Sequence, residues 1–348
     1  LEARRNNFLV AIADVRSDAA LAWVDISTGE LRVMPCQPSR FLPELSRLQP
    51  REVLVSENRE VDFLDLISEV GAAITPLAAA SFDSQGAAKR LCALYKIDSL
   101  DGFGVFSRAE IAALGAIIDY LELTQKGRLP LLRRPVQESV SSSMQIDAAT
   151  RRNLELTRSL SGTRKGSLLH AVDRTVTAAG GRLLERRVSS PSRDLPTIQA
   201  WLETTRWFVL HNPVAQSIRD LLRRCPDVQR AVSRLAIGRA GPRDLAAVRN
   251  AIAQLPEIIA TLGTDAPSSV GGWIESLTGF GDLLETLSLA LIDEPPQLAR
   301  DGGFVPSCYD DALDETRELR DQGRAVIAAF QRTYANDTGI SSLKIKHN

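Results

Sequence analysis

The sequence predicts several domains: an α/β domain first, an all-α domain second, and one long helix followed by a strand at the end. Three observations lead to this fold class. At 348 residues the chain is longer than one ordinary hydrophobic core supports. The period of its apolar residues changes from two to 3.6 after Gly104. From Tyr309 to about Asn336, only Gly323 interrupts a helical pattern.

Short apolar segments separated by polar turns predict a meander of three antiparallel strands at the start of the chain. The strands are expected at residues 8–14, 21–25 and 31–34. Helices and strands then alternate, with a helix from residue 41, a strand at 52–56, a helix at 61–70 and a strand at 73–77. This order is typical of an RNase H-like layered domain, so residues 1–128 are expected to fold as one α/β unit.

A capping box marks the change to helical structure, because Ser107 and Glu110 are spaced to bind each other's backbone N–H groups. The apolar stripe that follows continues to Leu121. Gly127 ends this pattern and two prolines prevent its continuation, so we predict that the first domain ends at residue 128.

The second domain, expected over residues 129–308, is predicted to be all-α. From about residue 144 to residue 300 every segment has a helical pattern, and no short internal repeat emerges. Asp147 and Asp194 are suited to cap helices. Three prolines stand near helix starts, where a missing N–H costs little: Pro196, Pro213 and Pro242.

The third segment, residues 309–348, is predicted to be a helix of roughly 40 Å followed by a strand, and to be incomplete. Its apolar stripe consists of Leu319, Val326, Ile327, Phe330 and Tyr334. Such a stripe normally packs on a returning helix, which these residues do not include. We therefore expect it to be covered by a second copy, folded back on the core or poorly ordered. Residues 341–347 alternate like a strand, with Lys344 and Lys346 on one face.

Composition and charge exclude several classes of function. The formal net charge is −1 and the pI is near 6.4, so any contact with nucleic acid must be local. The four cysteines and three histidines are dispersed, so neither a disulfide framework nor a metal site is expected. No apolar run is long enough to span a membrane and no signal-peptide pattern follows Leu1, so a cytoplasmic location is expected.

One segment looks like a phosphate-binding loop but is interpreted as a plain turn. Gly162–Ser167 has three residues between its glycines, and its lysine precedes the second glycine. The Walker pattern requires four residues between the glycines and a Lys-Ser/Thr pair after the second one. No nucleotide cofactor is therefore expected to bind this chain.

Three carboxylates offer an alternative function. Asp14, Asp25 and Glu57 stand at or just after the ends of predicted strands. In an RNase H-like fold, carboxylates gathered at strand ends can hold two Mg²⁺ ions for phosphodiester cleavage. The competing interpretation is that these side chains cap turns, since Asp25 directly precedes an Ile-Ser-Thr-Gly turn. A Mg²⁺-dependent nuclease is the alternative at this point.

Basic side chains on the predicted helices form three pairs. We interpret them as solvated faces or interdomain salt bridges, which is the usual role of such pairs. They are Arg151-Arg152, Arg186-Arg187 and Arg223-Arg224.

Several stretches, in order along essentially the whole chain, resemble the MutS family of bacterial DNA mismatch repair proteins. The stretches are Glu2–Phe8, Trp23–Glu30, Asp101–Gly104, Tyr120–Gly127, Ile146–Leu156, Leu235–Leu245, Arg300–Gly303 and Thr338–Ile345. The most specific is Ile146–Leu156, which is similar to the entry of the family's lever region. An ordered set of matches is stronger than any single motif.

The resemblance implies a role for each part. Residues 1–128 would be the connector domain, non-catalytic and RNase H-like, which docks MutL. Residues 129–308 would be the core or lever that couples mismatch recognition to the ATPase. Residues 309–348 would enter the clamp, which touches the backbone of duplex DNA, and Lys344 and Lys346 would be the DNA-binding residues.

The resemblance also implies what belongs to a longer parent protein. The family's Phe-x-Glu mismatch wedge and its Walker motif are not found here, so an internal fragment is expected. ATP and Mg²⁺, the homodimer and association with the nucleoid are implied for the full-length parent. No cofactor and no enzymatic activity are implied for this fragment.

Overall fold

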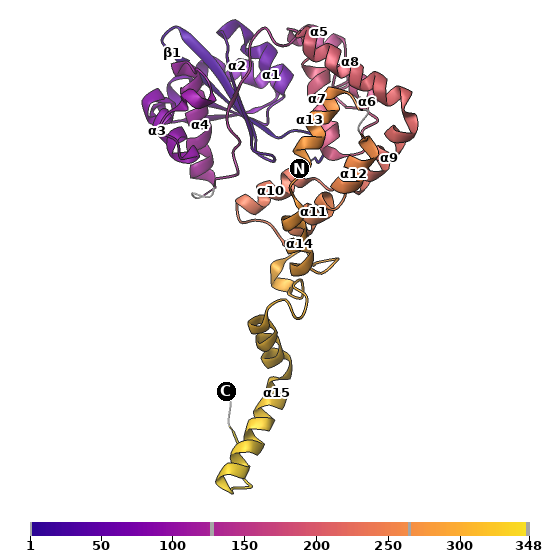
Figure 1. Cartoon of the computed structure of the whole chain (residues 1–348). Helices are drawn as coiled ribbons and strands as arrows, with labels where there is room; N and C mark the ends of the chain where they lie inside the picture. Colours follow the sequence, from indigo (N-terminus) through magenta and orange to yellow (C-terminus); the bar gives the residue numbers. More distant parts are fainter. Residues whose placement is uncertain (1, 126–128, 264–265, 346–348) are drawn as a thin grey trace.

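The computed structural model describes residues 2–125, 129–263 and 266–345. It contains a sheet domain, a helical domain beside it and one long helix that extends away from both (Figure 1). The first described residues lie between the two domains, and the last lie near the far end of the long helix. The predicted order of an α/β domain followed by an all-α domain is confirmed.

Within the described residues, six strands form a single sheet in the order β5-β4-β1-β2-β3-β6. The strands are β1 (Phe8–Val15), β2 (Asp18–Asp25), β3 (Glu30–Pro35), β4 (Glu52–Ser56), β5 (Ala73–Leu77) and β6 (Val136–Gln137). β1, β2 and β3 form the predicted antiparallel meander, and β4 and β5 continue the sheet parallel to β1. All five predicted strands are confirmed, and the side chains of β1, β2 and β4 are buried on both faces of the sheet.

β6 is a strand that the sequence did not suggest. It pairs in parallel with β3, and Leu132 just before it is buried in the core of the sheet domain. The chain after residue 128 therefore stays attached to the first domain. The predicted boundary itself falls in 126–128, outside the described residues, and stays a prediction.

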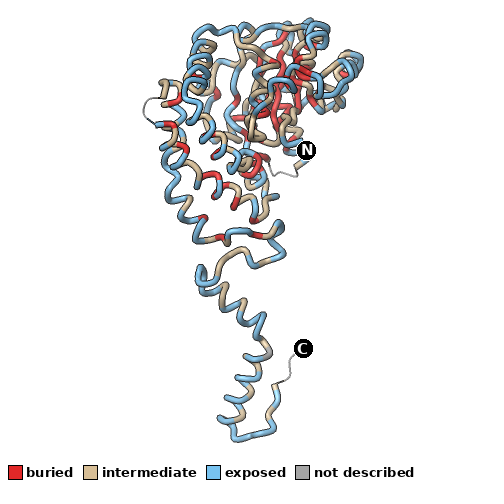
Figure 2. Tube along the Cα trace, turned by 90° about the vertical axis from the view of Figure 1, so that its right-hand side faces the viewer, coloured by how far each residue is buried: buried red, intermediate tan, exposed pale blue. Residues whose placement is uncertain are grey.

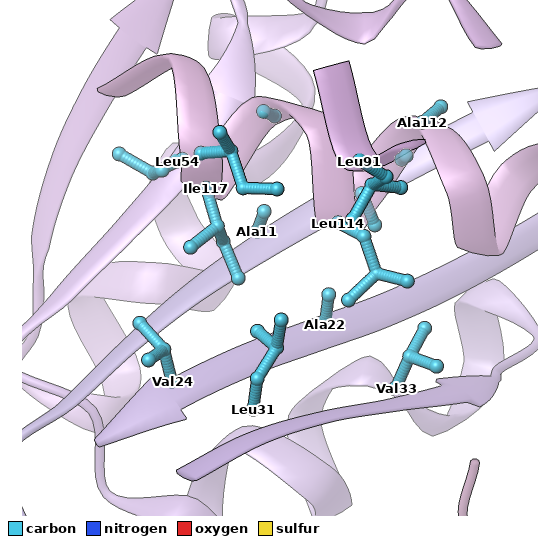
Figure 3. Packing of buried hydrophobic residues seen from close by; sticks show 14 of the residues in the cluster. Ala11, Ala22, Val24, Leu31, Val33, Leu54, Leu91, Ala112, Leu114 and Ile117 are labelled. Carbon is cyan, nitrogen blue, oxygen red and sulfur yellow. The ribbon is translucent and has the colours of Figure 1, made fainter. Parts of the chain in front are cut away.

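Helices cover both faces of the sheet. α4 (Arg108–Thr124), backed by α3 (Ser84–Tyr95), covers one face, and α1 (Phe41–Leu48) and α2 (Glu60–Val70) cover the other. Along β1, Leu9 and Ala11 pack toward α4, whereas Val10 and Ile12 pack toward α1 and α2. Figure 3 shows Leu114 and Ile117 of α4 packed over the side chains of the strands.

The helical domain is built from short helices around two small cores. Its helices are α5 (Ala148–Asn153), α6 (Leu168–Val172), α7 (Ala178–Ser189), α8 (Leu195–Leu210), α9 (Asn212–Arg224), α10 (Val228–Ala236), α11 (Pro242–Ile252), α12 (Leu255–Leu262), α13 (Ser268–Ser276) and α14 (Gly281–Ala290). One core joins α9, α12 and α13, and the other joins α10, α11 and α14. Figure 2 shows buried residues concentrated in the sheet domain and sparser among these helices.

The predicted helix caps of this domain are confirmed. Asp147 accepts a hydrogen bond from the N–H of Thr150 at 2.8 Å, and Asp194 accepts one from the N–H of Thr197 at 3.0 Å. All three prolines occupy the first turns of their helices. The expectation of helix throughout residues 144–300 is wrong for residues 154–167, which form turns, since two glycines there adopt positive φ angles.

The long helix α15 (Asp311–Thr338) begins at its cap Asp310 and ends at Gly339, which has a φ of 68°. This confirms the predicted helix. Leu319, Phe330 and Tyr334 of its apolar stripe are about half exposed, at 53%, 54% and 51%, and none of the α15 residues whose burial the structure describes is buried (Figure 2). The stripe is therefore not covered within this single chain.

The strand predicted to follow α15 is not formed in its described part, residues 341–345. The backbone turns back toward the helix, where the N–H of Ile345 donates to Oε1 of Gln331 at 3.3 Å. The physical reason is that a strand needs a partner strand to satisfy its backbone groups, and alternation alone supplies none.

Candidate functional site at the junction of the domains

The two lysines predicted to contact DNA stand at the far end of the molecule. Lys344 is exposed in the segment that follows α15. Figure 1 shows that this segment lies beside the distal part of α15, away from both domains. Lys346 lies outside the described residues. Their role as DNA-binding residues stays a prediction.

The three carboxylates proposed for a nuclease do not share one end of the sheet. In the register of β1 with β2, Asp14 pairs with Ala19 and Asp25 pairs with Phe8. The two aspartates therefore lie at opposite ends of the hairpin, about 20 Å apart at roughly 3.3 Å per residue. Two metal ions in a shared site need ligands within a few ångströms of each other, which this separation excludes.

Each of the three carboxylates also has a structural partner. Asp25 is fully buried and accepts a hydrogen bond from the N–H of Ser27 at 2.9 Å. Asp14 forms an ion pair with Arg59. Glu57 accepts from the N–H of Ala79 at 3.2 Å. Across residues 2–125, 129–263 and 266–345, no three His, Cys, Asp or Glu side chains are grouped to hold a metal ion. The nuclease interpretation is wrong, because the fold places Asp25 at the opposite end of the sheet from Asp14 and Glu57, and each carboxylate is used in local structure.

The segment Gly162–Ser167 is a turn, as predicted. Gly162 and Gly166 have φ angles of 79° and 92°, and the hydroxyl of Ser167 caps α6 by accepting from the N–H of His170 at 3.1 Å. The loop lies between helices and follows no strand. A Walker-type phosphate-binding loop follows a strand and directs its backbone N–H groups at the phosphates, and this segment does not have that arrangement.

The arginine pairs act mainly within and between domains. Arg151 is buried and donates to the carbonyl of Ser189 at 2.8 Å. Arg186 of α7 forms an ion pair of 2.7 Å with Glu30 of β3, which is an interdomain salt bridge of the predicted kind. The guanidinium of Arg187 lies over the ring of Trp201, 4.1 Å from its centre.

A continuous chain of charged side chains crosses the junction. From Arg186 it continues through Glu30 to Arg32 at 2.6 Å, then from Arg32 to Glu138 at 2.7 Å, and from Glu138 to Arg47 at 3.4 Å. The residues come from α7, β3, the segment after β6, and α1. Such networks fix relative positions better than single pairs do, because each side chain is already ordered by its neighbours.

The ion pairs from Arg186 to Arg47 keep their carboxylates and guanidinium groups charged. Burial by itself would raise the pKa of Glu30, but the guanidinium groups of Arg32 and Arg186 outweigh it and hold that pKa below the usual 4.5. For Arg32, burial works against the charge and the two carboxylates of Glu30 and Glu138 raise the pKa. The junction is therefore held by full charges at neutral pH.

Beside these ion pairs lies a cavity of about 40 Å³, lined by residues that include Trp23, Gln49, Thr157 and Glu185. It has room for about two or three ordered waters. Burial raises the pKa of Glu185, whose Oε2 atom has no hydrogen-bond partner within the protein. Pockets that bind nucleotides or other cofactors are on the order of 300 Å³ or more, so this cavity is not one of them.

The first residues of the chain connect the two domains directly. We call residues 2–7 the N-terminal strap. Arg182 of α7 donates to the carbonyl of Ala3 at 2.8 Å. Arg230 of α10 donates to the carbonyls of Glu2 at 3.1 Å and Arg5 at 2.8 Å. The strap therefore lies against the helical domain, although it leads straight into β1.

Arg182 also organises the helices that hold the strap. It makes a bidentate pair with Asp227, at 2.7 Å and 3.0 Å, and its side chain is only 4% exposed. Asp227 is the cap of α10, which carries Arg230. One buried arginine thus ties α7, α10 and the strap together.

On its other side the strap pairs with the sheet domain. The N–H of Asn7 donates to Oδ1 of Asp25 at 3.4 Å, and the N–H of Ile26 donates to the carbonyl of Asn7 at 3.1 Å. Sequence reasoning did not identify Arg182 or Arg230, since a single arginine in a helical pattern usually faces solvent. The available signal was Gly181 before Arg182, because the absent side chain lets Arg4 of the strap lie against α7.

Comparison with known protein families gives these two domains a class. A family model described as MutS domain II matches residues 7–133, and one described as MutS domain III matches residues 149–336. The matched ranges follow the order of the sheet domain and the helical domain with α15. The class is therefore that of the middle domains of MutS-type proteins.

Individual relatives agree over the full chain. The DNA mismatch repair protein MutS of Cereibacter sphaeroides strain ATCC 17023 is 57% identical over 348 residues, all of this chain and 39% of the relative. The protein of the same name from Paracoccus denitrificans strain Pd 1222 is also 57% identical, over 39% of its length. That from Ruegeria sp. strain TM1040 is 58% identical over 350 residues and 40% of its length.

The chain belongs to the MutS family. It spans about two fifths of the length of the curated relatives that it matches. Within the part of the chain that the structure describes, no helix combines the length and the apolar character of a membrane span.

Proposed function

We propose that this chain is the non-catalytic central part of a DNA mismatch repair protein, where it couples mismatch recognition to ATP hydrolysis. The observation that carries the proposal is the junction between the two MutS-type domains. There the strap and the ion pairs from Arg186 to Arg47 connect helices of one domain to strands of the other. Connected polar contacts of this kind pass a displacement from one domain to its neighbour.

For the sheet domain we propose an RNase H-like connector that docks MutL. Its strand order β3-β2-β1-β4-β5, with an antiparallel meander and then two parallel strands, supports the RNase H-like assignment. A docking role without catalysis is supported by the carboxylates of Asp14, Asp25 and Glu57, each of which forms an ion pair or a hydrogen bond with a nearby residue.

For α15 and the turn beyond it, we propose the entry to a clamp that touches the backbone of duplex DNA. A helix of 28 residues that projects from both domains suits contact with an extended ligand. Lys344 and Lys346 are the proposed phosphate contacts. In the full-length protein we propose ATP with Mg²⁺, a homodimer and a cytoplasmic, nucleoid-associated location.

DNA binding tests the clamp assignment. Two lysines neutralise about two phosphates, so the logarithm of affinity should fall by about two units per tenfold rise in salt. At physiological salt the affinity should be weak, on the order of 10⁻⁴ M. Fluorescence anisotropy with matched and G·T-mismatched duplexes should give equal affinities, because phosphate contacts do not read bases.

The matched control separates local contact from overall charge. Lys344→Ala/Lys346→Ala should abolish most binding, whereas Lys89→Ala/Lys165→Ala removes the same charge from two exposed positions elsewhere and should have little effect. Equal losses in both variants would point to overall charge. A mismatch preference above about fivefold would place base recognition inside this chain and contradict the division of roles.

Titration of the chain with MutL, and separately with ATP, tests the rest. MutL should bind, and binding should survive Lys344→Ala/Lys346→Ala because the proposed docking surface is the sheet domain. ATP should give no saturable heat in calorimetry, since Gly162–Ser167 is a turn between helices. A chain that bound neither DNA nor MutL would not fit the proposed function.

A further inference from the structure

The strap separates two buried charged side chains that belong to different domains. Asp25 at the end of β2 is 0% exposed, and Arg230 of α10 is 9% exposed. Among the described residues, Oδ2 of Asp25 and Nε of Arg230 have no hydrogen-bond partner, and the nearest carboxylate oxygen to that Nε is Oδ2 of Asp227 at 3.8 Å, beyond hydrogen-bond distance. Unsatisfied buried groups of opposite charge are costly apart and are stabilised by each other.

The contact points of these two side chains on the strap are close together. Arg230 donates to the carbonyl of Arg5, and Asp25 accepts from the N–H of Asn7. These positions are two residues apart, or about 7 Å of extended chain at most. The distance is within reach of a reoriented arginine side chain.

The charges of the two groups already interact. Burial lowers the pKa of Arg230, and the neighbouring Arg182 lowers it further, whereas the carboxylates of Asp227 and Asp25 raise it. Asp227 is shared between Arg230 and Arg182, because both of its carboxylate oxygens accept hydrogen bonds from Arg182. Asp25 has one oxygen that is free to accept Arg230.

In the observed arrangement the peptide groups of the strap stand between these charges. Strap carbonyls accept from Arg230, and a strap N–H donates to Asp25. If the strap moved out, Arg230 would keep only Asp227, whose Oδ2 lies 3.8 Å from its Nε and also accepts from Arg182. Asp25 would keep the N–H of Ser27 but lose that of Asn7. Pairing with Asp25 would then give Arg230 a carboxylate oxygen that it does not share with Arg182.

We propose that the strap is a latch with two positions, closed as observed and open with Arg230 paired to the free carboxylate oxygen of Asp25. Opening breaks the hydrogen bond from Ile26 to Asn7 and the two hydrogen bonds from Arg230 to the strap carbonyls. Coupling between domains requires an element with two states, and the latch would supply it. In this one respect the inference rests on the proposed coupling function.

Amide hydrogen exchange at Ile26, measured on the whole chain, tests the latch. The N–H of Ile26 is bound by the strap only when the latch is closed. Asp25→Asn keeps Oδ1 as the acceptor for Ser27 and Asn7 but removes the charge that stabilises the open position. Exchange at Ile26 should therefore become slower, by roughly ten- to a hundredfold for the loss of one charged hydrogen bond. If Asp25 had only a structural role, Asp25→Asn would give faster exchange at Ile26.

The effect should depend on Arg230. In an Arg230→Gln background the open position has no ion pair, so Asp25→Asn should no longer slow exchange at Ile26. Arg230→Lys retains the charge and should retain the slowing, and it serves in place of Arg230→Gln if that variant does not fold. Asp14→Asn, at the other end of the hairpin, is the matched control and should leave Ile26 unchanged.

Three results would overturn the latch. They are faster exchange in Asp25→Asn, unchanged exchange in Asp25→Asn, and equal slowing in the Arg230→Gln background, which would show a local gain from the new amide. The chain is measured without DNA, MutL or nucleotide. Failure of the DNA or MutL titrations would therefore leave this result standing, and failure here would leave the domain assignments standing.

Discussion

Replacement of Gly115 by alanine separates local helix preference from tertiary packing. Gly115 lies in the middle of α4, where alanine is better than glycine by about 1 kcal/mol on helix propensity alone. In the folded domain, however, an added Cβ would overlap the Cβ of Ala87 in α3 and lie 2.9 Å from its Cα. Carbon atoms in contact prefer about 3.5–4.0 Å, so α3 and α4 must move apart by about 1 Å.

The structure predicts which effect is larger. Overpacking of a buried contact costs about 1–3 kcal/mol, and this contact is at the upper end because backbone is involved and every neighbouring residue on α4 from Leu114 to Ile118 is buried. Subtracting about 1 kcal/mol of propensity leaves a net loss of about 2 kcal/mol in the unfolding free energy of the sheet domain.

The assay is hydrogen exchange of peptides from β1 and β2 across a urea series, which reports the sheet domain separately from the helices. The control is Gly115→Ala/Ala87→Gly, which removes the overlapping methyl and moves the glycine from α4 to α3. Because the 2.9 Å contact with the Cα of residue 87 remains, this variant should recover part of the lost unfolding free energy and lie between Gly115→Ala and the parent. If Gly115→Ala alone were neutral or stabilising, the close approach of α3 and α4 would be refuted.

Three further predictions follow from the same structure. Gly29→Ala should lower the melting temperature much more than Gly71→Ala, because both glycines have φ near 70° but only at Gly29 would a Cβ overlap the carbonyl of Leu131. Glu185→Gln should stabilise the chain at pH 7. Burial raises the pKa of Glu185 above 4.5, so its carboxylate costs stability as pH rises through the folded pKa, and the gain should vanish below about pH 4.5 in thermal melts. Cys308 is exposed and should react with a thiol reagent at pH 8 within the native state. Cys36, whose pKa burial raises to about 12, should react only on unfolding.

The strands and helix starts could be predicted from the sequence because their signals are local. Residues 8–14 and 52–56 are short apolar runs bounded by polar residues, and no distant contact is needed to recognise them as strands whose side chains point alternately to the two faces. Ser107 and Asp147 act on N–H groups two or three residues away, so their caps are also visible in the sequence. The most specific resemblance, at Ile146–Leu156, agrees with the family match over the helical domain.

Other predictions failed where the outcome depended on a distant partner. The strand beyond Gly339 has the right alternation, but its described part has no second strand to pair with and forms a turn. β6 is only two residues long, and its existence depends on the free edge of β3. A segment of this length carries no periodicity of its own.

The candidate site shows the same division most clearly. The sequence by itself determined that Asp14 and Asp25 end their strands and that Arg186 stands on a helix. Only the tertiary structure decided that the two aspartates lie at opposite ends of one hairpin, and that Arg186 meets Glu30 across the junction. Likewise Arg182 and Arg230 have the sequence context of ordinary helix arginines, and become buried only because the strap folds back between the domains. The physical reason is range: hydrogen bonds and side-chain periodicity act over a few residues of chain, whereas burial and charge pairing depend on which remote segments are brought within a few ångströms.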